Sequence, residues 1–144
     1  MRIAIGSDHA GFEEKALLVD YLLELGHDVV DRGPDDDGRV DYPDFAFPMA
    51  EAVAAGSYER GIAICGTGVG VSICCNKVAG VRCALCGDVL SASLTRRHND
   101  SNVLAMGGRI IGVETAKEIT RVWLATGFEG GRHSGRIAAS RPTL

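Results

Sequence analysis

The part of the sequence best suited to chemistry is a cysteine followed by a glycine-rich loop, within residues 61–76. A short apolar run from Ile62 to Ile64 is typical of a buried strand, and Cys65 follows it. Glycines then alternate at positions 66, 68 and 70, which lets the backbone approach a ligand closely. The apolar stretch that follows predicts a helix, and the unpaired N–H groups at a helix start favour negative charge. We therefore expect the thiolate form of Cys65 to be stabilised, as a base beside an anion hole.

Polar side chains follow three of the predicted strands at their carboxyl ends. Asp8 and His9 come after a strand at residues 2–6, Thr67 after the strand that ends at Cys65, and Arg109 after a strand at 102–106. Ligands of parallel α/β sheets bind at the carboxyl ends of the strands, so we expect these side chains to lie together. The simpler alternative for Asp8 and His9 is a helix cap and a first-turn residue.

A second set of candidates lies in the C-terminal third of the chain. His98 and Asn99 close a predicted helix, where a histidine also suits the helix dipole as an ordinary cap. Arg132 and Arg136 lie four residues apart with His133 between them, in a glycine-rich, basic tail. They form either a solvated pair or a phosphate clamp. We expect this set to converge with the first on one edge of the sheet.

The glycine loop matches neither common nucleotide-binding motif. A dinucleotide fingerprint needs G-x-G-x-x-G after the first strand, whereas this loop follows the third strand and has Val71 after its last glycine. The G-K-[ST] of a P-loop is also missing. Cys83 and Cys86 form a C-x-x-C, but they fall in a predicted strand and lack partners at zinc-ligand spacing. These patterns disfavour NAD, ATP, redox and zinc chemistry, and leave a tight turn without a ligand as the plain alternative.

The predicted elements alternate between strand and helix. We expect strands at residues 2–6, 27–31, 61–65, 81–86 and 102–106, each followed by a helix, and a last helical segment at 136–140. Five alternations predict a three-layer α/β/α, Rossmann-like open sheet of five parallel strands. We expect a single domain over residues 1–144, with the C-terminal tail or helix packing on a partner subunit.

The bulk composition excludes several classes of protein. A net charge of -4 argues against a nucleic-acid binder that works by bulk electrostatics. No stretch approaches the length of about 18 apolar residues that a membrane span needs. The N-terminus is interrupted too soon for a signal peptide, and the five cysteines are an odd number. We therefore expect reduced thiols and a cytoplasmic location.

Several motifs, in order along nearly the whole chain, together resemble the family of ribose-5-phosphate isomerase B, which also includes allose- and galactose-6-phosphate isomerases. They are DHAGF at 8–12, DYPD at 41–44, CGTGVG at 65–70, NKVAGVR at 76–82, HN at 98–99, GGR at 107–109 and FEGGRH at 128–133.

The resemblance implies an aldose–ketose isomerase that interconverts D-ribose 5-phosphate and D-ribulose 5-phosphate through an enediolate, without a metal or an organic cofactor. It implies that Cys65 is the base that moves a proton between C1 and C2, and that His98 with Thr67 opens the furanose ring. The implied substrate-binding residues are Asp8, His9, Tyr42, Gly66, Gly68, Val69, Gly70, Asn99, Arg109, Arg132 and Arg136. It also implies a homodimer or tetramer whose cleft takes residues from two subunits.

One branch of the family departs from this pattern: it has Gly at the position of Cys65 and a catalytic Glu at the position of Val71. Valine cannot abstract a proton, so this chain resembles the thiol branch. The sequence leaves open a six-carbon substrate, allose or galactose 6-phosphate. It also leaves open a non-catalytic module that binds sugar phosphates or nucleotides, because fold alone does not set function.

Overall fold

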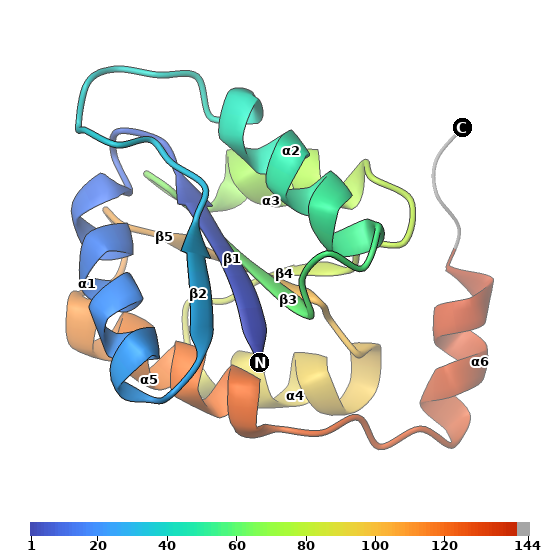
Figure 1. The fold of residues 1–144 in the computed structure, drawn as a ribbon. Coiled ribbons are helices and arrows are strands. Elements are labelled where there is room, and N and C mark those ends of the chain that lie inside the picture. The colour runs from blue at the N-terminus through green and yellow to red at the C-terminus, as the bar shows by residue number, and fades with distance from the viewer. Residues whose placement is uncertain (141–144) are drawn as a thin grey trace.

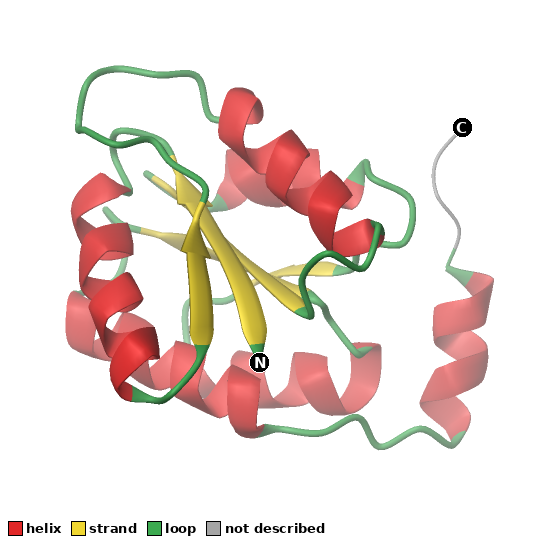
Figure 2. Cartoon of the chain, viewed as in Figure 1, coloured by secondary structure: helices red, strands yellow, loops and turns green. Residues whose placement is uncertain are grey.

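The computed structural model describes residues 1–140, which form a five-stranded sheet between two layers of helices (Figure 1, Figure 2). The strands are β1 (Arg2–Ser7), β2 (Asp28–Asp31), β3 (Arg60–Cys65), β4 (Cys83–Leu85) and β5 (Val103–Gly107). The helices are α1 (Phe12–Glu24), α2 (Pro43–Ala54), α3 (Val69–Asn76), α4 (Val89–Asn99), α5 (Val113–Ala125) and α6 (Arg132–Ala139). The predicted three-layer, Rossmann-like fold is confirmed.

All neighbouring strands pair in parallel, in the order β2-β1-β3-β5-β4. After β1 the chain moves to one side of the sheet, and after β3 it moves to the other. The loops that leave β1 and β3 therefore separate at the carboxyl edge, which is where open α/β sheets bind ligands. The backbone N–H of Asp8 donates to the carbonyl of Ile64 over 3.1 Å and ties these two strand ends together.

Large and small side chains alternate along the central strands, as in Ile3-Ala4-Ile5, Ile62-Ala63-Ile64 and Leu104-Ala105-Met106. The large residues face α1, α4 and α5, whereas the alanines face α2 and α3. Small side chains let the helices of that face pack close to the sheet. Cys65 belongs to this second face, in one cluster with Ala63 and Ala105. The strand period therefore aims the sulfur toward α3.

A local sequence signal explains the start of α4. The Asp88 side chain accepts a hydrogen bond from the N–H of Ser91 over 2.7 Å and so caps α4, as its residue type predicts. Two expectations about element bounds are wrong. The strand predicted at 81–86 shortens to β4, and the last helix begins at Arg132 instead of 136.

Cys83 and Cys86 face opposite sides of the sheet, as the predicted strand requires, because each belongs to a different one of the two clusters. None of the helices formed by residues 1–140 has the length and apolar character that crossing a membrane requires.

Candidate active site

Cys65 ends β3 with its side chain 4% exposed. The backbone N–H of Gly68 donates to its Sγ over 3.2 Å. Gly68 has φ 80 and begins α3, and a Cβ there would lie 2.5 Å from Leu85 Cδ1 and 2.7 Å from the carbonyl carbon of Met106. Glycine is therefore required by both conformation and space. The tight packing fixes an amide donor against the sulfur.

The first turn of α3 continues this donor-rich surface. The N–H of Val69 donates to Thr67 Oγ1, and the N–H of Ser72 donates to the carbonyl of Gly68. Among residues 1–140, the N–H groups of Gly70 and Val71 have no recorded acceptor. The ring of Tyr42 lies against the loop, because a Cβ on Gly70 would be 2.7 Å from Tyr42 Cζ. The loop thus offers free amide donors beside an aromatic wall.

The ends of β1 and β5 complete the carboxyl edge. Asp8 Oδ1 accepts from the N–H of Gly11 over 3.1 Å. Gly11 itself is the N-cap of α1 and no side chain caps this helix, so the simple reading of Asp8 and His9 as a helix cap and a first-turn residue is wrong. His9 Nδ1 lies 3.2 Å from both the backbone nitrogen and the carbonyl oxygen of Val40. Arg109 donates its N–H to the carbonyl of Gly66 over 2.9 Å, and its side chain lies beside Gly66. The first set of predicted residues therefore gathers around the Cys65 loop.

The second set forms a separate cavity of about 230 Å³, lined by His98, Asn99, His133, Arg136, Ile137 and Ser140. The rings of His98 and His133 stack with 4.4 Å between centroids and 15° between planes. His133 is 5% exposed, and Arg132 precedes it in the first turn of α6. Burial lowers the pKa of His133 below its usual value, and so do the neighbouring His98, Arg132 and Arg136 side chains, whereas Glu129 raises it.

The end of α4 is held by arginine side chains that the sequence did not single out for this role. Arg82 donates from Nε to the carbonyl of Asn99 and from Nη2 to that of Asp100, both over 2.9 Å. Arg96 Nη1 donates to Asp100 Oδ1 over 2.8 Å. Asp100 has φ 45, a left-handed conformation that ends the helix. These contacts satisfy the last carbonyls of α4 and fix the backbone that carries His98 and Asn99.

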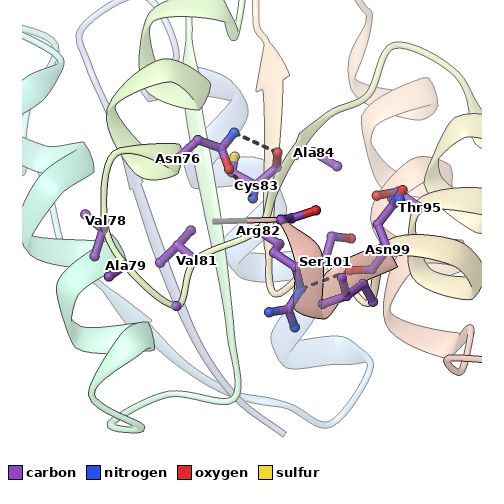
Figure 3. A pocket seen from close by; sticks show the side chains of 13 residues that line it. Asn76, Val78, Ala79, Val81, Arg82, Cys83, Ala84, Thr95, Asn99 and Ser101 are labelled. Atoms are coloured by element: carbon purple, nitrogen blue, oxygen red, sulfur yellow. Dashed lines mark hydrogen bonds between the residues drawn. The ribbon is translucent and has the colours of Figure 1, made fainter. Parts of the chain in front are cut away.

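A larger cavity, of about 500 Å³, lies on the other side of Asn99 and separates β4 from α6. Figure 3 shows its lining, with Asn76 bonded to Cys83, and Arg82 bonded toward the end of α4. The NKVAGVR motif therefore supports the end of α4 through Arg82. The motif is visible in the sequence, but it does not indicate that the Arg82 side chain reaches the end of α4.

The two sets of residues lie at opposite edges of the sheet. α4 follows β4 and runs back along the sheet, so Asn99 ends beside Arg82, immediately before β4. Cys65 lies at the other end of the strands, about 20 Å away for a strand the length of β3. In Figure 2 the strand tips point to the upper left, whereas α6 lies at the lower right. The expectation that one chain brings His98, Asn99, Arg132 and Arg136 to the edge that carries Cys65 is wrong.

The nitrogen and oxygen ligand atoms of His98, Glu129 and His133 lie within 4.8 Å of one another. Two nearly parallel stacked rings direct their in-plane lone pairs side by side instead of toward one point. Glu129 is also engaged, because Arg97 Nε donates to its Oε1 over 2.5 Å. This geometry favours stacking and ion pairing over metal coordination at the cluster.

Comparison with known proteins gives consistent matches over nearly the full chain. A family model described as Ribose/Galactose Isomerase matches residues 3–139. Ribose-5-phosphate isomerase B of Escherichia coli is 50% identical, over 96% of this chain and 93% of that protein. D-erythrulose-4-phosphate isomerase of Pectobacterium atrosepticum is 44% identical, over 95% and 91%. The structure of Clostridium thermocellum ribose-5-phosphate isomerase B has 47% identity and a TM-score of 0.95, over 96% and 93%.

Proposed function

This chain belongs to the ribose/galactose isomerase family, and we propose that it interconverts D-ribose 5-phosphate and D-ribulose 5-phosphate through an enediolate. The observation that carries this proposal is the Cys65 thiol, which accepts an amide hydrogen bond at the end of a central strand, beside a helix start. The similarity to E. coli ribose-5-phosphate isomerase B supports the choice of substrate.

Cys65 is the base in this proposal. The thiolate removes the proton from C2 of the open-chain aldose, and its electrons form a C1–C2 double bond while those of the carbonyl move onto the C1 oxygen. The proton of the C2 hydroxyl passes to the C1 oxygen, C2 becomes the carbonyl carbon, and the thiol returns its proton to C1. A positioned base contributes about 10²–10⁴-fold to such a step. The loop from Gly66 to Gly70, with the free N–H groups at the start of α3, stabilises the charge that develops on oxygen.

The remaining residues of the carboxyl edge hold the sugar. His9 and Arg109 bind the phosphate, Asp8 and Tyr42 bind hydroxyl groups, and Thr67 takes part in ring opening. His98 is the main group for ring opening, Asn99 binds a hydroxyl, and Arg132 and Arg136 complete the phosphate site. Anchoring the phosphate holds C1 and C2 in fixed geometry before the base.

We further propose that a homodimer builds this site from two chains, because the His98 set lies at the edge opposite Cys65. A two-fold axis that sets two sheets antiparallel places the carboxyl edge of one beside the amino edge of the other. Such an isologous contact creates two equal sites, each with Cys65 of one chain and the partner subunit's His98. α6 carries Arg132 and Arg136 at the periphery of the chain, where it can pack on a partner (Figure 1).

Subunit mixing tests the shared site. Cys65→Ala and His98→Asn chains, carrying different affinity tags, are co-expressed and the doubly tagged dimer is isolated. If the site is shared, one of its two sites is intact, and the dimer has about half the parent's turnover. The matched control pairs a Cys65→Ala/His98→Asn chain with an unchanged chain, a dimer in which both shared sites are broken. Activity in this control and none in the first dimer shows instead that Cys65 and His98 act within one chain.

The substrate is tested with a panel of aldose phosphates. We expect the highest kcat/KM with D-ribose 5-phosphate, ahead of allose and galactose 6-phosphates. A four-carbon sugar phosphate is the second candidate, since a 44% identical relative is named for D-erythrulose 4-phosphate. Deuterium incorporation at C2 of ribose 5-phosphate in D₂O separates an isomerase from a non-catalytic binding module, which gives none.

A further inference from the structure

The plane of the His98 ring is set by a stacking contact with His133. His98 lies in the last turn of α4, partly exposed, and within residues 1–140 no hydrogen bond to the ring is recorded. The contact is the stack on His133, with 4.4 Å between centroids and 15° between planes. A ring at a helix end turns freely about its side-chain torsions unless a neighbour restrains it. The orientation of His98 therefore depends on His133.

His133 is well placed to restrain a neighbour, because it is itself held. It is 5% exposed, and its backbone N–H donates to the carbonyl of Gly130 over 3.1 Å. Its Nε2 lies 3.7 Å from Glu129 Oε2 without a hydrogen bond to it, and Glu129 is paired with Arg97. The backbone N–H of Glu129 also donates to the carbonyl of Arg97 over 3.1 Å. We name the set of Arg97, Glu129 and His133 the imidazole brace. Arg97 precedes His98 in the chain, and the ring of His133 stacks on the ring of His98.

We propose that His133 is a positioning residue, which holds the imidazole of His98 in the orientation required for opening the sugar ring. This inference rests on the proposed function, in which His98 opens the furanose. It assigns no direct contact between His133 and the reacting atoms.

The charges around His133 set the conditions under which the brace works. His98 faces it from α4, Glu129 from the preceding segment, and Arg132 and Arg136 from α6. Burial and the neighbouring His98, Arg132 and Arg136 side chains lower the pKa of His133 on balance, against Glu129, which raises it, so its ring is neutral at neutral pH. A neutral ring stacks on His98 without repulsion. Protonation at acidic pH places a positive ring against His98, which weakens the stack.

The test compares His133→Ala, which removes the stack, with His133→Phe, which keeps a flat ring without a titrating group. Ring opening is measured directly in a Cys65→Ala background, where isomerisation is blocked. The probe is ¹³C saturation transfer between the furanose and open-chain forms of C1-labelled ribose 5-phosphate. We expect His133→Ala to lower the enzyme-catalysed exchange by roughly 10–100-fold, the scale set by a misplaced catalytic group. His133→Phe is expected to retain exchange within about threefold of its background.

Steady-state kinetics of the same changes in the otherwise unchanged chain supply the second readout. We expect kcat for ribose 5-phosphate to fall with His133→Ala while KM stays within about threefold, because positioning acts on the chemical steps. We expect protonation of His133 to lower the kcat of the parent at acidic pH, and we expect this decrease to be absent in His133→Phe. A raised KM with unchanged kcat means that His133 binds the phosphate, and that result overturns the proposal.

The failure of the inference differs from that of the proposed function. If the exchange falls with His98→Asn but not with His133→Ala, ring opening by His98 stands and the brace is wrong. If His98→Asn leaves the exchange unchanged, the ring-opening role itself fails. If His133→Phe loses as much exchange as His133→Ala, stacking does not account for the effect and the proposal is overturned.

Discussion

The Cys65 half and the His98 half of the proposed site differ in the chemical groups that form them. In the Cys65 half, the groups next to the sulfur are backbone: the donors are main-chain amides, and the shape of the loop is fixed by glycines packed against strand ends. The His98 half consists of side chains: two stacked rings, an Arg97–Glu129 pair and the arginines of α6. Backbone held by a parallel sheet is insensitive to pH and salt, whereas side-chain clusters at a periphery respond to both. The comparison teaches that one site can combine a rigid part with a titratable one.

The largest expected effect is a loss of turnover when the Cys65 half is changed. Cys65→Ala removes the base, so we expect turnover to fall by about 10²–10⁴-fold while the melting temperature changes little. Isomerase assays with thermal melts check this. Cys74→Ala is the matched control, because Cys74 is buried in the same cluster, on α3. Equal activity in the two variants would contradict the assignment of Cys65.

The next prediction compares the packing of the two halves by replacing one glycine in each half with alanine. A Cβ on Gly107 would lie 2.6 Å from the backbone of Thr67, whereas one on Gly135 in α6 meets nothing within 4 Å. We expect Gly107→Ala to lower the free energy of unfolding by about 1–3 kcal/mol, as overpacking does. Gly135→Ala is expected to raise it by about 0.5–1 kcal/mol, because alanine favours a helix interior. Denaturant unfolding measures both, and similar losses would refute the contrast.

A smaller effect concerns pH at the carboxyl edge, in the first turn of α1. Glu14 is 8% exposed, its Oε1 has no hydrogen-bond partner among residues 1–140, and burial raises its pKa to about 7. The folded-state pKa exceeds the unfolded one, so stability is highest below about 4.5 and falls as pH rises through about 7.

We therefore expect Glu14→Gln to raise the free energy of unfolding at pH 8 by roughly 1–2 kcal/mol relative to its effect at pH 5. Unfolding curves at the two pH values check this. A pH-independent effect would mean that the carboxyl group is not titrating in the folded state.

The smallest expected effect lies at the His98 half, where stability decreases as the pH falls, the opposite of the dependence expected from Glu14. The pKa of His133 is lowered on folding, chiefly by burial, so stability is full above the unfolded value of 6.5 and falls as pH drops below it. We expect the melting temperature of the parent to decline slightly from pH 7 to pH 5 and His133→Phe to decline less. A steeper decline for His133→Phe would contradict this assignment.

Much of the fold followed from local patterns. The alternation of apolar runs and amphipathic stretches predicted five strands, each followed by a helix, and the structure has this order of elements. The glycine loop after a buried strand predicted where Cys65 would lie and which polar residues would surround it. These features depend on backbone preferences over a few residues, and the period-two pattern of β3 also sets the face that carries Cys65.

Other features depend on contacts between distant segments. The order of the strands, and so the edge at which each helix ends, placed His98 and the tail arginines opposite Cys65. Burial of Glu14 and the stack of His98 on His133 also arise from packing between elements, which no local pattern encodes. The sequence by itself determined the elements and the chemistry of the Cys65 loop, because those are set by neighbouring residues. Only the tertiary structure decided which side chains meet, because a helix that returns along a sheet carries its last residues a full strand length away.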